Sequence, residues 1–286
     1  MNNDTKLNIL CLKIKKLTLE MIRERGFGHL GGSFSIIETL TVLFGKIMNI
    51  NPDQPNDPSR DYFVLSKGHA GPAYYSTLAA CGYFPEATLM TLNKNETCLP
   101  SHPDRNKTIG VDCTTGSLGQ GISQAAGIAY GFKIQNKSNR VFCIIGDGEC
   151  NEGQVWEAIQ FIQNKKLDNL ILLVDNNKQQ VDGFTEDISF KYDFNKLFDS
   201  LGYYVQEVNG QSLKAIEETI NKALEVKDKA KVIILNTIKA QSLPHYENKI
   251  ASHHLKLSTE DKAYFQLYID EFTNEMERLA NEMATR

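Results

Sequence analysis

Two short apolar runs, separated by a stretch with helical periodicity, constrain the fold of this chain most. Residues 141–145 and 170–174 have the length and apolar character of strands buried inside a parallel sheet. Between about residues 149 and 167, apolar side chains recur at helical spacing, namely Val155, Trp156, Ile159 and Ile162. The pattern predicts one unit of strand, helix and strand.

Polar residues stand where each predicted strand ends. Asp147 lies between two glycines after the first run, and Asn177 follows the second run. A right-handed crossover places the carboxyl ends of parallel strands at one edge of the sheet, so the two side chains can converge there. One carboxylate and one amide suit Mg²⁺, and the amino end of the intervening helix suits a diphosphate. The alternative is a pair of unrelated turns.

The rest of the chain repeats the alternation of strands and helices. Further strands are predicted at 62–66, 203–208 and 232–235, and helices at 6–25, 33–46, 71–82, 86–93, 119–135 and 212–226. Ser33 is the expected cap of the second of these helices. This order predicts an α/β fold whose parallel sheet carries helices on both faces. We expect residues 1–286 to form a single domain, with 259–286 as a carboxy-terminal helical extension.

Composition excludes several classes of function. The formal net charge is −4 and charged residues make up 23% of the chain, so neither disorder nor a nucleic-acid-binding surface is expected. No apolar stretch approaches the roughly 20 residues of a membrane span, and the amino terminus lacks the apolar core of a signal peptide. The cysteines show no metal-ligand spacing. We therefore expect a cytoplasmic protein with reduced thiols and neither nucleic-acid nor membrane partners.

Several motifs together resemble the transketolase family of thiamine diphosphate enzymes. The GDG triplet of GDGECNEGQVWEAIQF is followed, at about the family's usual distance, by the paired Asn of LILLVDNNKQQVDG. The others are GFGHLGGSFS at 26–35, LSKGHAGPA at 65–73 and SHPDRNKTIGVDCTTGSLGQGIS at 101–123. They occur in family order, and the resemblance covers about residues 5–256. It implies the thiamine diphosphate-binding fold, with thiamine diphosphate and Mg²⁺ as cofactors.

The resemblance also implies roles for individual residues. Those expected to hold the metal are Asp147, Asn177 and Gln179, the last through its carbonyl. Those expected to contact the cofactor are His69, Gly116, Ser117, Leu118, Gly148, Asn177 and His253. Those expected to be catalytic are His29, His102, His253 and Glu152. Glu152 would join a carboxylate network between two active sites. Taken singly, a histidine in a loop is more often structural, and a glutamate suits the first turn of a helix.

One region departs from the family pattern. In KAQSLPHYENKIASHHLKL, His253 stands at the family's histidine, but Ser252 replaces the usual Trp and Ala240-Gln241-Ser242 replaces a Gly-rich loop. Likewise, Asn209-Gly210-Gln211 stands where the family commonly has a Gly-His-Asp turn. Losing glycines restricts the backbone, and losing the Trp removes a packing surface. These changes indicate either altered substrate choice or a loosened loop.

The resemblance is to the diphosphate-binding part of a transketolase. It implies the amino-terminal subunit of a split enzyme, active only with a separately encoded partner that carries the pyrimidine-binding domain and its glutamate. A heterotetramer with two chains of each kind is expected, with a large obligate interface on the order of 2,000 to 5,000 Å². The expected reaction transfers a two-carbon ketol unit from a ketose, or its phosphate, to an aldose, or its phosphate.

Two alternatives stay open at this point. The first is the α subunit of a 2-oxo acid dehydrogenase, against which the segment Ser66-Lys67-Gly68-His69 argues. The second is a non-catalytic partner that retains the fold, which the altered region 240–253 favours.

Overall fold

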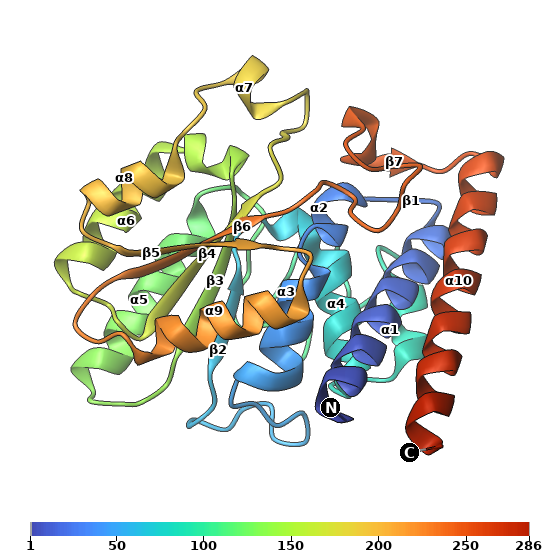
Figure 1. The fold of residues 1–286 in the computed structure, drawn as a ribbon, viewed down its shortest axis with the longest axis horizontal. Coiled ribbons are helices and arrows are strands. Elements are labelled where there is room, and N and C mark those ends of the chain that lie inside the picture. The colour runs from blue at the N-terminus through green and yellow to red at the C-terminus, as the bar shows by residue number, and fades with distance from the viewer. Residues whose placement is uncertain (1, 286) are drawn as a thin grey trace.

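The computed structural model describes residues 2–285 and is built around one five-stranded parallel sheet (Figure 1). Its strands, in spatial order, are β2 (Tyr62–Leu65), β3 (Val141–Gly146), β4 (Leu170–Asn176), β6 (Lys231–Asn236) and β5 (Tyr204–Asn209). Each neighbouring pair is parallel. The predicted α/β fold is therefore confirmed.

Successive side chains of the central strands enter two separate cores, because a strand projects alternate residues to opposite faces. In β3, Phe142 and Ile144 join one core, while Cys143 and Ile145 join the other. The first core is completed by α1 (Asn2–Arg25), α3 (Ile37–Val42), α4 (Gly71–Ala80) and α9 (Leu213–Glu225). The second is completed by α5 (Gln120–Ile134), α6 (Gly153–Asn164) and α8 (Phe194–Ser200). Helices thus cover both faces of the sheet, which explains why its strands are apolar throughout.

The register of the sheet aligns the carboxyl ends of its strands. Gly146 pairs with Asp175, and Asn176 pairs with Asn236. The residues that follow β2, β3, β4 and β6 therefore emerge side by side at one edge, where ligands bind in open α/β sheets.

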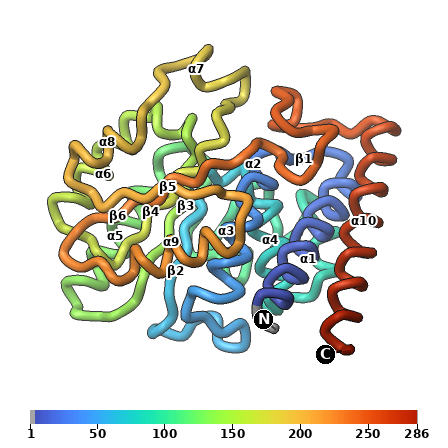
Figure 2. The backbone as a smooth tube through the Cα atoms, in the orientation of Figure 1, coloured from blue at the N-terminus to red at the C-terminus, as the bar shows by residue number. Residues whose placement is uncertain are grey.

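A second, two-stranded sheet joins distant parts of the chain. β1 (Phe27–Gly28) pairs antiparallel with β7 (Leu255–Lys256). This pairing places the loop after α1 against the loop that precedes the last helix, α10 (Thr259–Ala284). α10 runs alongside α1 in the opposite direction, and the two chain ends lie at the same end of this helix pair (Figure 2). Ser258 and Asp261 form a capping box at its start.

The predicted helix at 33–46 is wrong in its continuity. Its residues instead form α2 (Gly31–Phe34), α3 and a π-helical turn (Leu43–Ile47). Ser33 lies inside α2 and donates to the carbonyl of His29 instead of capping a long helix. The break leaves the Ser35 hydroxyl 2.7 Å from the Asp175 carboxylate, so a tertiary contact at the sheet edge accompanies the loss of helical periodicity.

Two further helices are shorter than their periodicity predicts. The segment predicted at 86–93 is a 3-10 helix over Glu86–Thr91. The segment after β3 begins as a 3-10 turn (Gly148–Asn151), and the α-helix starts only at Gly153. The remaining short elements are a 3-10 turn at Gly68–Ala70, α7 (Thr185–Ile188) and a 3-10 turn at Ile250–Ser252.

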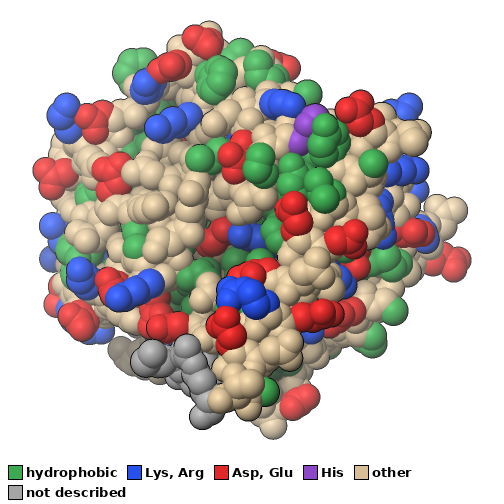
Figure 3. Space-filling view, turned by 45° about the vertical axis from the view of Figure 1, so that its right-hand side comes forward, with side chains coloured by type: hydrophobic (Ala, Val, Ile, Leu, Met, Phe, Trp, Pro, Cys, Tyr) green, Lys and Arg blue, Asp and Glu red, His purple; other side chains and the backbone are tan. Residues whose placement is uncertain are grey.

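The surface carries charges of both signs. On the face in Figure 3, Lys and Arg side chains are interspersed with Asp and Glu side chains. Among residues 2–285, no helix is both long enough and apolar enough to cross a lipid bilayer.

Candidate active site

Asp147 and the turn after β4 form one hydrogen-bonded unit. One carboxylate oxygen of Asp147 accepts the N–H of Gly148 at 2.8 Å, and the other accepts the N–H of Lys178 at 2.7 Å. Next to Lys178, the amide oxygen of Asn177 accepts the N–H of Gln179 at 3.0 Å. The structure thus brings together the three residues expected to hold a metal, and it excludes two unrelated turns.

The carboxylate of Asp147 is in an environment that calls for a positive charge. The side chain is buried, and burial together with the nearby Asp175 raises the pKa of Asp147 to about 7. A bound divalent cation would favour the ionised form. An aspartate carboxylate, an asparagine amide oxygen and a main-chain carbonyl are the oxygen donors that Mg²⁺ takes from proteins, so the donor set fits this ion.

A buried ion pair lies beneath this unit. The ammonium of Lys67 is 2.5 Å from the carboxylate of Asp175, and both side chains are almost fully buried. Burial alone would raise the pKa of Asp175, but Lys67 and the hydroxyls of Thr237 and Ser35 hold it below its usual value. The same carboxylate accepts the amide N–H of Asn177 at 2.8 Å. This contact fixes the orientation of the Asn177 amide. Sequence analysis assigned no role to Lys67 or Asp175.

The histidines that the sequence singled out form one cluster. The ring of His29 lies 5.6 Å from that of His69, 6.0 Å from that of His102 and 5.5 Å from that of His253, measured between ring centroids. The pairing of β1 with β7 brings the first and last of these loops together. His254, which sequence analysis did not single out, lies 4.6 Å from His29.

The clustered imidazoles are neutral near pH 7. Burial lowers the pKa of His29 to about 4 and that of His253 to about 3, and neighbouring positive groups add to the effect. The pKa of His69 is also well below its usual value, chiefly because of burial. A neutral imidazole has one N–H donor and one acceptor nitrogen. The cluster can therefore hydrogen-bond a carbonyl or hydroxyl oxygen and exchange a proton with it.

A cavity of 160 Å³ connects the Asp147 unit with the histidine cluster. Its lining includes Lys67, His69, Leu118, Gly148, Asn177, Gln179, Lys239 and His253. Several buried polar atoms in this lining have no hydrogen-bond partner: both amide atoms of Gln179, Nε2 of Gln180 and Nδ1 of His253. Leaving such atoms unpaired is costly. A polar ligand in the cavity would satisfy them, so the residues present fit a diphosphate cofactor.

Lys239 is a further residue of this cavity that sequence analysis did not identify. Its ammonium donates to the carbonyl of Gln180 at 2.7 Å, and burial lowers its pKa to about 8. Near neutral pH it is therefore still charged and faces the same space as Lys67. The signal was present in the sequence, because Lys239 follows the β6 strand as Asp147 follows β3.

The loop before α5 carries the expected backbone contacts. Gly116 lies so near Gly68 that a Cβ on Gly68 would be 2.8 Å from the Gly116 nitrogen, which explains the glycine at this crossing. Leu118 reaches the cavity, whereas the side chain of Ser117 is exposed. The structure brings this loop beside His102.

The two glutamates after β3 differ in their surroundings. Glu152 is exposed and begins α6 without a side-chain cap, at the rim of the cavity. Glu149 is buried and accepts hydrogen bonds from Ser66, Gly119 and Gly146 at 2.6, 2.8 and 3.0 Å. It ties together the ends of β2 and β3 and the start of α5. Sequence analysis gave a role only to Glu152.

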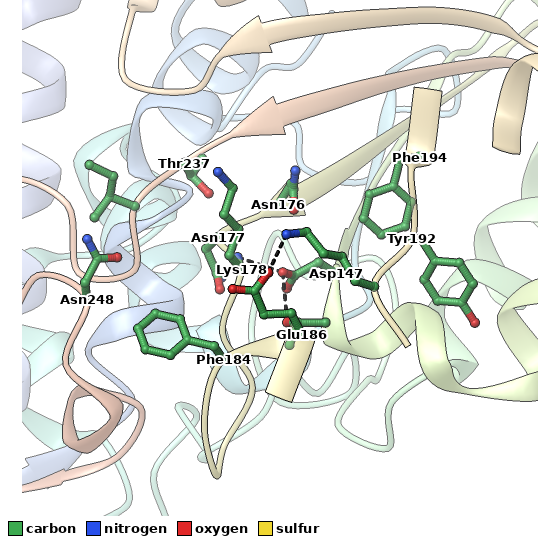
Figure 4. Close-up of a pocket in the computed structure, with 13 residues that line it drawn as sticks. Asp147, Asn176, Asn177, Lys178, Phe184, Glu186, Tyr192, Phe194, Thr237 and Asn248 are labelled. Atoms are coloured by element: carbon green, nitrogen blue, oxygen red, sulfur yellow. Dashed lines mark hydrogen bonds and ion pairs between the residues drawn. The ribbon is translucent and has the colours of Figure 1, made fainter. Parts of the chain in front are cut away.

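A larger cavity of 510 Å³ lies on the other side of Asp147 (Figure 4). It shares Asp147 and Asn177 with the first cavity, but its remaining lining is more aromatic, with Phe184, Tyr192 and Phe194. None of the clustered histidines lines it. The smaller cavity is thus the one that combines oxygen ligands, ammonium groups and imidazoles.

Comparisons with known proteins agree with this site. Residues 8–269 match the family described as transketolase, thiamine diphosphate binding domain. The chain is 46% identical over 247 residues to the 6-deoxy-6-sulfo-D-fructose transketolase subunit SqwG of Clostridium sp. (strain MSTE9), covering 86% of this chain and 90% of that protein. It is 37% identical over 227 residues to one subunit of the apulose-4-phosphate transketolase of Actinobacillus succinogenes, covering 79% and 82%.

Solved structures show the same fold. The transketolase from Campylobacter jejuni superposes with a TM-score of 0.83 at 25% identity, covering 97% of this chain. This chain spans 48% of the length of that protein. The five-stranded sheet, the converging Asp147 and Asn177, and the match over residues 8–269 lead to one conclusion. This chain belongs to the transketolase family, in which it represents the thiamine diphosphate binding domain.

Proposed function

We propose that this chain is the amino-terminal subunit of a thiamine diphosphate-dependent transketolase. Its reaction is transfer of a two-carbon ketol unit from a ketose, or its phosphate, to an aldose, or its phosphate. The observation that carries the proposal is the cavity that Asp147, Lys239 and His253 line together, in which buried polar atoms have no partner within the protein. We further propose that residues 1–286 are a single diphosphate-binding domain, with 259–286 as a helical extension.

The metal and the cofactor's diphosphate would occupy the Asp147 side of the cavity. Asp147, Asn177 and the carbonyl of Gln179 would hold Mg²⁺. The diphosphate would meet the ammonium of Lys239, the backbone of Gly148 and the two imidazoles His69 and His253. The backbone of Gly116, Ser117 and Leu118 would meet the rest of the cofactor. When bound, thiamine diphosphate supplies the carbon nucleophile that carries the ketol unit.

The remaining histidines would act on the substrate. His29 and His102 are neutral, so each can donate a hydrogen bond to a carbonyl oxygen and accept a proton from a hydroxyl group. Charge that develops on the carbonyl oxygen is stabilised by such fixed donors. His253, between the cofactor and His29, would serve both. Glu152 lies exposed at the cavity rim, where it can join a carboxylate network with a second chain.

A separate partner subunit would complete the active site. The two relatives described above are both named as transketolase subunits, and this chain covers most of each. Close to the cavity, the segment 181–190 exposes apolar side chains, with 56% of Val181 and 70% of Phe190 accessible. Such a surface suits burial against another protein. The partner would carry the pyrimidine-binding domain, in a heterotetramer with two chains of each kind.

The relatives also suggest the donor sugar. The identity of 46% to a 6-deoxy-6-sulfo-D-fructose transketolase subunit favours a sulfonated ketose. A ketose phosphate such as apulose 4-phosphate is the alternative, because the subunit named for it is 37% identical.

Reconstitution tests the proposal. The chain alone, with thiamine diphosphate and Mg²⁺, should not transfer ketol units, whereas the chain mixed with its pyrimidine-domain partner should do so. Donor choice is measured by supplying the sulfonated ketose and the ketose phosphate in parallel reactions with one aldose acceptor. Turnover by the isolated chain would contradict the split-subunit assignment. A complex that binds thiamine diphosphate in no saturable way would instead support a non-catalytic partner.

A further inference from the structure

The loop that carries Lys239 is backbone-strained. Ala240 and Ser242 have φ angles of 60° and 70°, in the left-handed region that side chains with a Cβ disfavour. Each such residue lowers the population of this loop conformation by roughly tenfold. The loop nevertheless keeps the conformation that glycines would permit. Something else in the structure must therefore hold it.

A buried polar network contacts this loop from outside the cavity. The ammonium of Lys15 is 2.7 Å from the carboxylate of Glu38, and their side chains are only 10% and 5% exposed. Lys15 also donates to the hydroxyl of Ser242 at 2.8 Å. Two strongly buried charges are thus satisfied partly by each other and partly by the strained loop.

Gln241 joins the network to the loop. Its amide N–H₂ donates to the carboxylate of Glu38, and its amide oxygen accepts the N–H of Ile238 at 3.3 Å. The side chain is 1% exposed, so water does not compete for these bonds. Gln241 therefore fastens the backbone on both sides of Lys239 and Ala240 to a charge pair on α1 and α3.

The loop in turn fixes the position of Lys239. The N–H of Ala240 donates to the carbonyl of Gly31 at 3.1 Å. The stem of Lys239 packs so closely on Gly31 that a Cβ there would lie 2.7 Å from its Cγ. With its stem held in this way, the ammonium reaches the carbonyl of Gln180 inside the cavity.

We propose that Gln241, anchored by the buried pair of Lys15 and Glu38, is a positioning residue that holds Lys239 in the cavity. The network supplies the restraint that glycine residues would otherwise make unnecessary. The positioning itself is independent of any ligand. Only its consequence, a properly placed ammonium for a diphosphate, rests on the proposed function.

Chemical labelling of Lys239 in the full chain without cofactor tests the positioning directly. The substitution Gln241→Leu keeps the volume of the side chain and leaves Lys15 paired with Glu38. We expect Lys239 to be acetylated about tenfold faster in this variant, as measured by mass spectrometry of its peptide. Lys67, buried in the same cavity but held by Asp175, should keep its wild-type rate. Equal rates for Lys239 in both proteins, or a parallel rise at Lys67, would overturn the proposal.

Glycine should replace the network. Adding Ala240→Gly and Ser242→Gly to Gln241→Leu removes the cost of the left-handed conformation, so the acetylation rate of Lys239 should return to within about threefold of wild type. A rate as high as that of Gln241→Leu alone would show that the restraint does not act through backbone strain. The matched control is Gln163→Leu on α6, which lies outside the network and should leave labelling at Lys239 unchanged.

A titration with magnesium pyrophosphate then separates the two proposals. Wild type and the glycine-containing triple variant should bind with similar affinity, and Gln241→Leu about fivefold or more weakly. Equal affinity in Gln241→Leu and wild type would overturn the link from Gln241 to the ligand. Absence of saturable binding in wild type would count against the proposed function alone, because the labelling result stands without a ligand.

Discussion

The carboxylate of Asp147 accepts the main-chain N–H of Lys178 at 2.7 Å. This single contact joins the turn after β3 to the turn after β4. It also orients Asp147 beside Asn177, so the candidate metal site is built by the sheet edge and does not depend on a flexible loop. The predictions below test what this arrangement does.

Removing the charge of Asp147 should abolish metal-dependent cofactor binding. Asp147→Asn keeps the size of the side chain but withdraws the only carboxylate among the proposed Mg²⁺ ligands. We expect the affinity for thiamine diphosphate in the presence of Mg²⁺ to fall by roughly tenfold to a hundredfold, the range for losing a metal-site interaction. Calorimetric titration of the complex with its partner measures it. Asp182→Asn, an exposed residue in the same loop, should bind as wild type does.

The same variant should change how stability depends on pH. Burial and Asp175 raise the pKa of Asp147 to about 7, above the value near 4 of an unfolded aspartate. Because the folded state then binds the proton more tightly, this group makes the metal-free protein less stable as pH rises between these values. Asp147→Asn should therefore gain stability relative to wild type on going from pH 5 to pH 8, by up to about 3 kcal/mol. Denaturant unfolding of both proteins across that range, without Mg²⁺, would reveal an unchanged difference if the idea is wrong.

Lys178 should be replaceable by glycine with a gain in stability. Its φ angle is 65°, its side chain is exposed, and glycine adopts this conformation without steric cost. We expect Lys178→Gly to stabilise the protein by about 1 kcal/mol. The matched control is Lys165→Gly, at an exposed lysine with a φ angle of −84°, which should lose stability because glycine gains backbone entropy in the unfolded chain. Urea denaturation compares the two, and a loss of stability in Lys178→Gly would contradict the strain argument.

His29 should contribute to turnover and not to cofactor binding. Replacing it by Asn removes proton exchange at the centre of the histidine cluster, so kcat of the reconstituted enzyme should fall roughly a hundredfold or more. The affinity for thiamine diphosphate should change little. Since burial lowers the pKa of His29 to about 4, its imidazole is neutral above about pH 5. The wild-type rate should therefore show no loss between pH 6 and pH 7 from protonation of this group, and a rate that halves there would require a different assignment.

Much of the site followed from local sequence because strand ends are local features. The runs at 141–145 and 170–174 predicted the strand, helix, strand unit, and parallel pairing then required Asp147 and Asn177 to converge. Lys239 obeys the same rule at the end of β6, so it was predictable and was missed only because its loop lacked glycines.

Other parts of the site were not predictable from local pattern. Ser35 interrupts a helical periodicity to reach Asp175, which is 140 residues away in the chain. The ion pair of Lys67 and Asp175 likewise depends on which strands are neighbours. Such contacts outweigh the small propensities of individual residues, so periodicity overestimated the helix at 33–46.

The sequence by itself determined the strands, their order of alternation with helices, and the residue types at each strand end, because these depend on side-chain periodicity and turn chemistry. Only the tertiary structure decided how the loops after α1 and before α10 meet. The pairing of β1 with β7 gathers His29, His253 and His254, and burial in that cluster sets their charge. It also decided that Ala240 and Ser242 keep a left-handed backbone, since the restraint comes from Lys15 and Glu38, which lie far earlier in the chain. Distances between residues far apart in sequence, and the desolvation that follows from them, are properties of the packed molecule.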